Sequence, residues 1–568
     1  MNKLLTPWLF TASLVTLTGL LSSDPVAAQA VTQGTVRRHL VYFRDKTGTP
    51  YSVTQPQAFL SARAIARRTR QGIAVLPRDL PVNPAYVAQV RAVSGGPRVV
   101  YTSRWFNAAV VSCDSATLGR IVALGTVRSA TTLNRKAGAV PTPPKVETPV
   151  AEPGALRPDA TRSQYGKAYR QNLQIGALAM HDAGYRGEGM QIAVFDAGFP
   201  GVNTIGALQP LFQEGRLLGT RNFVDGGTSV YLRNSHGTNC VSTMAANQSG
   251  NFIGTAPKAS YHLCITEDVN SEHPIEEANW LAAAEYADSS GVDVISSSLG
   301  YTDFDAPSPS YTYADMNGRT AISSRAAAVA ARVGMVVVNA AGNEGTSPQH
   351  FISAPADADS IISVGAVDSL GNHASFSSYG PSADGRIKPT MSSMGLASAV
   401  MAPSGAVFRG NGTSYACPIL AGMVAGFWQA NPTLTAQQVI MALRGTSSQA
   451  SSPDNTLGYG IPNFVRAYNL LHPNNPLATA PAVAAEPLAV YPNPLGVGQL
   501  TLVLPSDLRG QKLSVRILDV RGAVAARQEL SGTIGSEVQL HLNTLAKGQY
   551  ICEVSAAGAV RTVRFEQR

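Results

Sequence analysis

Apolar runs that alternate with alanine-rich stretches place the strongest constraint on how the middle of this chain can fold. Three runs carry apolar residues at nearly every position, as strands buried on both faces do: Gln191–Phe195, Val292–Ile295 and Met335–Val338. Helical stretches rich in alanine lie between and beside them, at Glu277–Ala287 and Ser324–Arg332. Because strands and helices alternate, the pattern predicts an α/β domain with a parallel sheet flanked by helices.

Two proline-rich stretches divide the 568 residues into units. Six prolines fall between Pro141 and Pro158, and a second such stretch runs from His472 to Pro487. Segments of this composition stay extended and accessible, as linkers and processing regions do. We therefore expect an N-terminal unit at 31–130, a linker at 131–162, a large middle unit at 163–471, a second linker at 472–486 and a C-terminal unit at 487–568.

The two flanking units have different patterns. In the N-terminal unit, a strand at His39–Phe43, a helical run at Gln57–Arg70 and strands at Arg98–Thr102 and Ala108–Ser112 predict a small α+β fold. The C-terminal unit alternates apolar and polar residues in short runs, which predicts an all-β, immunoglobulin-like sandwich. These runs are Leu500–Leu504, Leu513–Leu518, Val538–Leu542, Tyr550–Val554 and Val560–Phe565.

The first thirty residues have the composition of a signal peptide. Lys3 precedes an apolar stretch from Leu9 to Leu21, and Ala28-Gln29-Ala30 offers small residues for cleavage. A membrane anchor would need about 20 unbroken apolar residues, and four Ser or Thr residues interrupt this stretch. We expect residues 1–30 to direct export and to be removed.

The net charge of +8 is concentrated in one part of the chain. Residues 31–112 hold twelve Lys or Arg and only two acids, while the remainder is close to neutral. The charge therefore does not indicate nucleic-acid binding.

Three clusters in the middle unit combine into one chemistry. Asp196 ends the first buried run, His236 lies in Asn234–Ser242, and Ser414 lies in the glycine-rich segment Gly410–Pro418. Taken singly, each residue has an ordinary structural explanation, such as a cap for the aspartate. Together, in this order and on separate loops, they are what nucleophilic acyl transfer requires.

Each residue type has a definite task in that chemistry. The hydroxyl of Ser414 would attack a carbonyl, His236 would accept its proton and return it to the leaving amine, and Asp196 would orient the imidazole. Asn343 follows the run Met335–Val338, and its side-chain amide could stabilise the negative oxygen of the tetrahedral intermediate.

On these motifs the chain resembles the subtilisin-like serine proteases (subtilases) over about 300 residues. The resemblance assigns Asp196, His236 and Ser414 as the catalytic triad and Asn343 as the oxyanion-hole residue. It also implies two substrate-binding segments: Ser298, Leu299 and Gly300 would pair with the substrate backbone, and Ala340, Ala341 and Gly342 would form a wall of the main specificity pocket.

The implied activity is that of a secreted serine endopeptidase, which hydrolyses peptide bonds in proteins through an acyl-enzyme on Ser414. A transpeptidase or macrocyclase on the same fold is one alternative, although nothing resembles the helical insertions of those enzymes. A non-catalytic binding protein derived from a protease is another, but such proteins lose members of the triad.

The sequence departs from the family pattern beside the histidine. Asn239 stands where the family usually has a second histidine, and Cys240 stands where many members have valine. We expect Cys240 to be a partly buried thiol beneath the imidazole, although a small core residue fits equally well. Cys264 and Cys417 could pair with each other or with Cys240, and one of the five cysteines must remain unpaired.

No cofactor or metal is expected. The segment Asp303-Phe304-Asp305 lacks the alternating oxygen ligands of a calcium loop, so we interpret it as a solvated loop. A structural calcium ion elsewhere stays open at this point.

The resemblance extends to the flanking units. The N-terminal unit stands in the place of a subtilase propeptide, which would plug the cleft as an intramolecular inhibitor and be cut off between about 131 and 165. A stable accessory domain is the alternative. The C-terminal unit resembles the sorting domain of the type IX secretion system, on Val490–Pro494, Val515–Gly522 and Leu545–Tyr550. It implies transit through the periplasm, recognition by that machinery, and a secreted or outer-surface location; a carbohydrate- or protein-binding sandwich is the alternative.

Deletion of Val490–Arg568 tests the sorting role. We expect the shortened protein to accumulate in the periplasm of its native host, because the segment that the secretion machinery recognises is missing. Immunoblots of periplasm and culture medium measure this distribution, and unchanged secretion would contradict the assignment.

Overall fold

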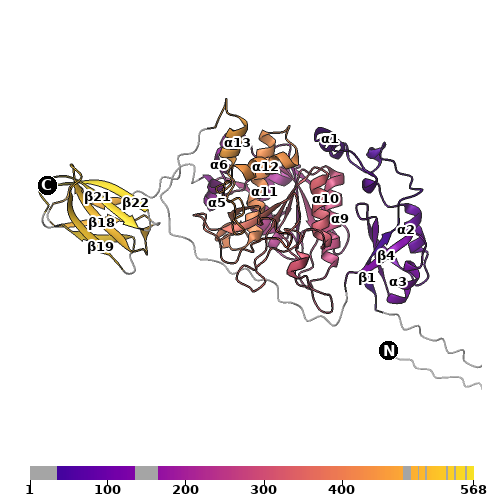
Figure 1. Ribbon diagram of the computed structural model, residues 1–568. Coiled ribbons are helices and arrows are strands. Elements are labelled where there is room, and N and C mark those ends of the chain that lie inside the picture. Colours follow the sequence, from indigo (N-terminus) through magenta and orange to yellow (C-terminus); the bar gives the residue numbers. More distant parts are fainter. Residues whose placement is uncertain are drawn as a thin grey trace, which may run out of the picture.

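A computed structural model describes residues 35–134, 164–477 and 488–568, the last range without 497, 506–507, 532–534, 543–544 and 557–558. The predicted signal peptide, residues 1–30, lies outside the described residues, as do most residues of the two predicted linkers. The described parts form an N-terminal unit, a central α/β unit and a C-terminal β unit (Figure 1).

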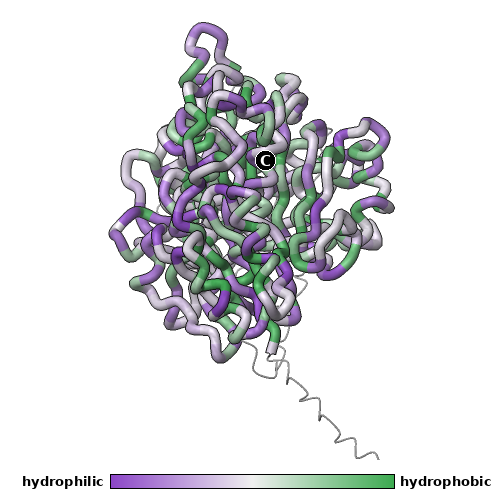
Figure 2. Tube along the Cα trace, turned by 90° about the vertical axis from the view of Figure 1, so that its right-hand side faces the viewer, coloured by the Kyte–Doolittle hydropathy of each residue, from purple (hydrophilic) through white to green (hydrophobic). Residues whose placement is uncertain are grey.

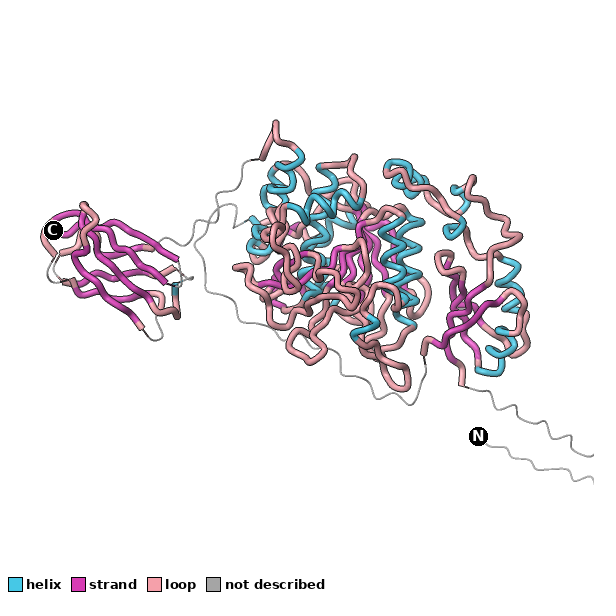
Figure 3. The backbone as a smooth tube through the Cα atoms, in the orientation of Figure 1, coloured by secondary structure: helices cyan, strands magenta, loops and turns pink. Residues whose placement is uncertain are grey.

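The described part of the central unit is built on a seven-stranded sheet in the order β13-β12-β11-β10-β5-β9-β6. All neighbouring strands in it are parallel, which confirms the predicted fold class. Its strands are β5 (Gln191–Asp196), β6 (Leu217–Asn222), β9 (Ser260–Ile265), β10 (Val294–Ser297), β11 (Val336–Ala340), β12 (Ile362–Val367) and β13 (Met391–Met394). Figure 3 shows the strands (magenta) between layers of helices (cyan).

The continuous apolar runs arise because both faces of the sheet are covered. In β5, Ile192 and Val194 belong to one hydrophobic cluster, while Ala193 and Phe195 belong to another. The first cluster is completed by α8 (His236–Ala245) and α11 (Thr413–Ala430), and the second by α9 (Ile275–Ser290) and α10 (Ile322–Arg332). Successive residues of a strand point to opposite faces, so each face of β5 needs its own apolar residues.

Shorter elements complete the central unit. The helices are α5 (Tyr169–Gln174), α6 (Ala177–Asp182), α7 (Gln209–Gln213), α12 (Ala436–Gly445) and α13 (Phe464–Leu471), with 3-10 turns at Gly206–Leu208 and Tyr313–Asp315. Two small antiparallel pairs are β7 (Asn247–Gln248) with β8 (Phe252–Ile253), and β14 (Ser398–Met401) with β15 (Val407–Gly410).

The described N-terminal unit has a four-stranded antiparallel sheet in the order β2-β3-β1-β4. Its elements are β1 (Arg37–Phe43), α1 (Ala62–Arg70), α2 (Pro84–Arg91), β2 (Arg98–Ser103), β3 (Ala108–Cys113), α3 (Ser115–Val122) and β4 (Val127–Thr132), with 3-10 turns at Pro56–Ala58 and Pro77–Asp79. Strand β4 runs two residues past the predicted end of the unit at 130.

The predicted helix from Gln57 to Arg70 is too long at its start. A 3-10 turn occupies Pro56–Ala58, and the side chain of Ser61 accepts a hydrogen bond from the amide of Ala64. A serine side chain that accepts such a bond marks the N-terminus of a helix, so α1 begins only at Ala62.

The N-terminal sheet packs against the helix layer of the central unit. On β1, Val41 and Phe43 belong to the unit's own core with α2 and α3, whereas Leu40 and Tyr42 belong to the cluster that contains α9 and α10. Trp105 and Val110 lie in that same cluster. The helices α9 and α10 therefore lie between two sheets, as Figure 1 also shows.

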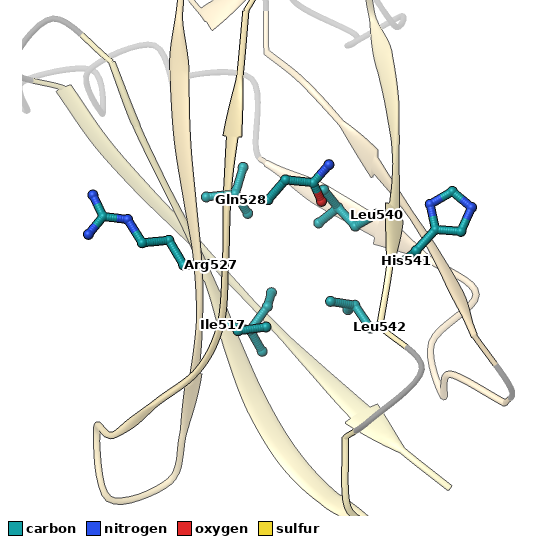
Figure 4. Close-up of a pocket in the computed structure, with 8 residues that line it drawn as sticks. Ile517, Arg527, Gln528, Leu540, His541 and Leu542 are labelled. Carbon is teal, nitrogen blue, oxygen red and sulfur yellow. The ribbon is translucent and has the colours of Figure 1, made fainter.

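The C-terminal unit consists of two antiparallel sheets in its described residues, β16-β17-β20 and β19-β18-β21-β22, which share one core. Its strands are β16 (Ala489–Tyr491), β17 (Gln499–Val503), β18 (Leu513–Asp519), β19 (Val524–Leu530), β20 (Glu537–His541), β21 (Gly548–Ala556) and β22 (Ala559–Gln567). The all-β prediction is confirmed. A small pocket opens between the two sheets, lined by residues of β18, β19 and β20 and by Leu542 (Figure 4). None of the predicted site residues lines it.

Hydrophobic and hydrophilic stretches alternate over short distances along the trace in Figure 2. Within the described ranges, no helix combines the length and the apolar character that a membrane crossing requires.

Lys388 carries a buried amine in the central unit. Its side chain is 4% exposed, and its Nζ donates a hydrogen bond to the carbonyl oxygen of Ala358 at 2.7 Å. Burial, and to a smaller extent the charge of Arg386, lowers its pKa to about 7, against the opposing effect of Asp357. Folding therefore favours the neutral amine.

We expect the free energy of unfolding to rise with pH between about 7 and 10.5. In that window the unfolded chain still binds the proton that folded Lys388 has lost, so stability grows by up to about 1.4 kcal/mol per pH unit from this group. Below pH 7 both states bind the proton and the cost of burying the charge is complete.

Urea unfolding of the wild type and of Lys388→Met across this range measures the slope. The lost bond to Ala358 affects the variant equally at every pH, so the difference in slope isolates the amine. Equal slopes for the two proteins would show that Lys388 keeps its charge on folding.

Candidate active site

Asp196 and His236 are brought together by a strand end and a helix start. Asp196 is the last residue of β5, and His236 is the first residue of α8. The imidazole Nδ1 lies 2.8 Å from Oδ1 and 3.0 Å from Oδ2 of Asp196. Gly237 permits this approach, since a Cβ there would lie 2.9 Å from the Cβ of Asp196 and 2.4 Å from the carbonyl oxygen of Gly198.

The environment of this pair favours a charged imidazole. Asp196 is fully buried, and its Oδ1 also accepts a hydrogen bond from the amide of Ala197 at 2.7 Å. Burial lowers the pKa of His236, but the charge and hydrogen bond of Asp196, together with the contact of Cys240, outweigh burial and raise the pKa well above its ordinary value. The His236 side chain is 23% exposed, so its ring still reaches solvent.

Ser414 lies in the first turn of α11, beside the histidine. Its carbonyl oxygen accepts hydrogen bonds from Ser298 Oγ at 2.8 Å and from Cys240 Sγ at 3.4 Å. Cys240 Sγ is in turn 3.8 Å from Nδ1 of His236. The next residue, Tyr415, stacks its ring on that of His236 with centroids 6.2 Å apart. Three loops distant in sequence thus meet at the N-termini of α8 and α11.

Asn343 is fixed by the residue before Ser414. Its Oδ1 accepts hydrogen bonds from the amide of Thr413 at 2.9 Å and from Thr413 Oγ1 at 3.0 Å. Because a backbone N–H can only donate, the amide oxygen must face Thr413, which leaves the Nδ2 group available to donate elsewhere. A Cβ built on Gly412 would lie 3.9 Å from that Nδ2.

The segment that follows β10 lies at the same edge of the sheet. Ser298 is 8% exposed and held by its bond to Ser414, and Gly300 is exposed. The carbonyl oxygen of Leu299 accepts a hydrogen bond from Asn339 Nδ2 at 3.0 Å. The segment is therefore anchored from both sides while its end stays accessible.

The segment Ala340–Gly342 begins at the last residue of the neighbouring strand β11. The amide of Ala341 donates to Val364 at 2.9 Å, and its carbonyl oxygen accepts from the amide of Ser353 at 3.1 Å. Cβ atoms built on Gly300 and Gly342 would lie 2.2 and 3.1 Å from Ser353 Oγ. The two predicted substrate-binding segments therefore converge on Ser353.

Thr413, Tyr415 and Ser353 were not among the predicted site residues. Thr413 and Tyr415 stand inside the Gly410–Pro418 cluster, so that motif already contained them. Ser353 carries no sequence signal, because only the fold brings it to Gly300 and Gly342.

All five cysteines lie in the described residues, and all are buried and unpaired. The open pairings among Cys240, Cys264 and Cys417 are thus not formed. Cys240 is fully rather than partly buried, and burial raises its pKa to about 11. It is a neutral thiol near pH 7.

Two groups of three side chains in the described part of the chain have the spacing of metal ligands: Asp196 with His236 and Cys240, and Glu267 with Glu272 and Glu276. Neither includes Asp303 or Asp305. In the first group, Asp196 and His236 already form a hydrogen bond with each other. In the second, burial raises the pKa of Glu267 to about 8, and that carboxyl accepts hydrogen bonds from Tyr301 and Thr266.

Comparison with protein families matches three parts of the chain. Residues 187–460 match the Subtilase family. Residues 38–145 match the Peptidase S8 propeptide domain, Bacteroidota, and residues 489–565 match the Secretion system C-terminal sorting domain.

Individual relatives are similar over about half of the chain. Subtilisin DY of Bacillus licheniformis is 34% identical over 289 residues, which is 50% of this chain and 92% of the relative. Subtilisin E of Bacillus subtilis (strain 168) is 34% identical over 292 residues, 50% of this chain and 67% of the relative. Subtilisin Savinase of Lederbergia lenta is 31% identical over 294 residues, 51% of this chain and 94% of the relative.

The electrostatic coupling of Asp196 and His236 predicts a titration. In Asp196→Asn the charge that raises the pKa of His236 is gone while the burial remains, so we expect the pKa of His236 to fall below that of the wild type. Imidazole NMR of protein labelled with ¹³C in its nine histidines measures it.

His181 serves as the internal control, since mainly burial lowers its pKa to about 4 and it lies outside the site. We expect its titration to be the same in both proteins. An unchanged pKa of His236 in Asp196→Asn would show that the carboxylate does not govern the imidazole.

Proposed function

Since the chain belongs to the subtilase family, we propose that it hydrolyses peptide bonds with Ser414 as the nucleophile, His236 as the general base and Asp196 as the carboxylate that orients the imidazole. The protein is a secreted serine endopeptidase with an N-terminal propeptide and a C-terminal sorting domain. The observation that carries the residue assignment is the contact between a fully buried carboxylate and an imidazole beside the N-terminus of α11.

The contact with Asp196 decides which nitrogen of His236 acts as the base. An ionised carboxylate only accepts hydrogen bonds, so Nδ1 carries a proton, and the form that acts as the base is the neutral imidazole with its lone pair on Nε2. That lone pair would take the proton of the Ser414 hydroxyl as its oxygen attacks the substrate carbonyl carbon. The negative charge of Asp196 would stabilise the imidazolium formed in this step.

The two halves of the reaction use the same groups. When the tetrahedral intermediate collapses, the C–N bond breaks, the imidazolium gives its proton to the leaving amine, and Ser414 holds the acyl group as an ester. Water then attacks the ester while His236 accepts a proton from it. The carboxylic acid leaves, and the proton returns to Ser414.

Asn343 is our candidate for the main donor to the oxyanion. Its amide oxygen accepts two hydrogen bonds from Thr413, and these bonds fix the orientation of the side-chain amide. The Nδ2 group therefore points away from Thr413. Donors held in place before the reaction stabilise the developing charge without reorganisation. The backbone amide of Ser414 would be the second donor.

Substrate would bind along the two loop segments that meet at Ser353. We assign Ser298, Leu299 and Gly300 to main-chain pairing with an extended peptide, and Ala340, Ala341 and Gly342 to a wall of the pocket for the residue before the scissile bond. The Ser298 hydroxyl also donates a hydrogen bond to the carbonyl oxygen of Ser414. This bond fixes the distance between the segment that would pair with substrate and the proposed nucleophile.

The units outside the central one have supporting roles in this proposal. The propeptide (31–130, with β4 extending to Thr132) would inhibit the enzyme until the chain is cut between about 131 and 165, and the catalytic unit would span 163–471. After the linker at 472–486, the sorting unit at 487–568 would be recognised by the type IX secretion machinery and removed on export.

We expect Asn343→Ala to lower kcat by about 10²–10³ with little change in KM, a magnitude known from subtilisin itself. The reason is that Nδ2 would contact the oxygen mainly when it carries negative charge. Hydrolysis of a chromogenic peptide by the secreted, processed enzyme measures both constants.

Ser414→Ala defines the background activity of a protein without the proposed nucleophile. It should clear no casein, bind no fluorophosphonate and keep its propeptide attached. Asn203→Ala, at an exposed asparagine, is the matched control and should retain full activity. If Asn343→Ala kept wild-type kcat, the oxyanion role would be wrong, and labelling of Ser414→Ala would overturn the nucleophile.

A further inference from the structure

Helix α1 of the propeptide docks on the catalytic unit almost without hydrophobic contact. Its sequence is ARAIARRTR, and the side chains that it buries are Ala64, Arg67 and Arg68. Among the described residues, none of α1 belongs to a hydrophobic cluster of either unit. Charge and hydrogen bonds must therefore hold this helix.

Asp288 is the centre of its docking site. This carboxylate, at the C-terminal end of α9, is fully buried and contacts Arg67. It also lies 2.8 Å from Arg68 Nη2 and 2.7 Å from Arg104 Nη2, both from the propeptide. Burial alone would raise the pKa of Asp288, but the charges of Arg67, Arg104 and Arg68 hold it below its ordinary value. The carboxylate is ionised under its three guanidinium partners.

Further bonds fix the helix along its length. Arg63 donates to the carbonyl oxygens of Gly291 at 3.0 Å and Gly189 at 2.7 Å, and it pairs with Asp293. Gln71, just past the end of α1, donates to the carbonyl oxygen of Gly334 at 2.8 Å and accepts from the amide of Ala436 at 2.9 Å. The helix is thus bonded to backbone at several points of the catalytic unit.

Two glycines leave room for these side chains. A Cβ on Gly291 would lie 2.7 Å from the Cβ of Arg63, and one on Gly334 would lie 2.8 Å from Nε2 of Gln71. Both glycines have positive φ, +89° and +91°, so a side chain there would also strain the backbone. The surface of the catalytic unit is therefore complementary to α1 both in shape and in charge.

This docking site is at the opposite edge of the sheet from the candidate active site. Gly189, Asp293 and Gly334 precede β5, β10 and β11, whereas Asp196, Ser298 and Ala340 stand at the other ends of the same strands. In a parallel sheet these two sets lie on opposite edges. The contact of α1 is therefore remote from any part of the propeptide that would block the active site.

We propose that α1 is a clamp for which the surface of Asp288, Gly291–Asp293 and Gly334 is the specific docking site, and that this clamp sets how long the propeptide stays on the enzyme after the linker is cut. The inference rests on the proposed role of the propeptide as inhibitor and adds a second, remote determinant of that inhibition. The partner that the surface recognises is an arginine-rich helix, supplied by this chain.

The energetic reason lies in the buried carboxylate. Removal of one member of a buried, hydrogen-bonded charge pair leaves the other without compensation and mainly speeds dissociation. Three guanidinium groups share Asp288, while Asp79 at 3.1 Å is a further partner of Arg68. Neutralising Asp288 would leave Arg67 and Arg104 buried against an uncharged group.

The test uses the full chain carrying Ser414→Ala, with the recognition sequence of an unrelated site-specific protease placed within 135–163. After the linker is cut, propeptide and catalytic unit should elute together on gel filtration. Competition with labelled propeptide then gives the dissociation constant. We expect Asp288→Asn to raise this constant by roughly 30-fold or more.

Asp182→Asn is the matched control, because Asp182 is an exposed carboxylate on α6; it should bind as the parent does. If Asp288→Asn fails to fold, Arg67→Met and Arg63→Gln test the clamp from the propeptide side and should also weaken binding. Arg67→Met combined with Asp288→Asn should cost less than the sum of the two changes, since both remove the same pair.

Binding equal to that of the control in the Asp288, Arg67 and Arg63 variants would overturn the clamp. The measurement is independent of catalysis, because every protein in it carries Ser414→Ala. Failure of the clamp therefore leaves the triad untouched, and residual casein clearing by Ser414→Ala would refute the triad without touching the clamp.

Discussion

Parallel strands end at the same edge of a sheet, and the position of every predicted site residue in this protein depends on that constraint. Asp196 ends β5, Ser298 follows β10, and Ala340 ends β11, and these three strands are neighbours. Helices α8 and α11 then bring His236 and Ser414 to the same edge from the other direction. The sheet thus supplies a carboxylate and the two proposed binding segments, while two helix N-termini supply the imidazole and the hydroxyl.

The helix layer of α9 and α10 has two partners rather than one. On one side Trp280 packs edge-on against Phe195 of β5, with centroids 5.4 Å apart, and on the other side the cluster continues into the propeptide sheet through Tyr42 and Trp105. A helix that is buried nearly all round belongs to a core and not to a surface. Loss of the propeptide must therefore expose apolar surface on these helices, which favours a propeptide that binds tightly.

The two edges of the parallel sheet, at opposite ends of its strands, carry different kinds of residue. The edge with the strand ends holds small residues, hydroxyl groups and the Asp196–His236 pair. The other edge carries Asp288 and Asp293, which face the arginines of α1. Part of the basic excess in 31–112 is thus matched within the molecule, because Arg63, Arg67, Arg68, Arg70 and Arg104 pair with these two aspartates.

The sequence alone was enough to predict the parallel sheet, from continuous apolar runs, and the β unit, from apolar residues that alternate with polar ones. The order of contiguous motifs also predicts the residue set Asp196, His236, Ser414 and Asn343, whose roles remain a proposal. The start of α1 was wrong, since the serine cap and the 3-10 turn before it compete with a helical composition. What only the tertiary structure decided are contacts between distant residues: Thr413 with Asn343, Ser353 with Gly300 and Gly342, and Asp288 with three arginines. A hydrogen bond or ion pair depends on distances of about 3 Å between atoms that the chain separates by tens or hundreds of residues, and no local pattern encodes such a distance.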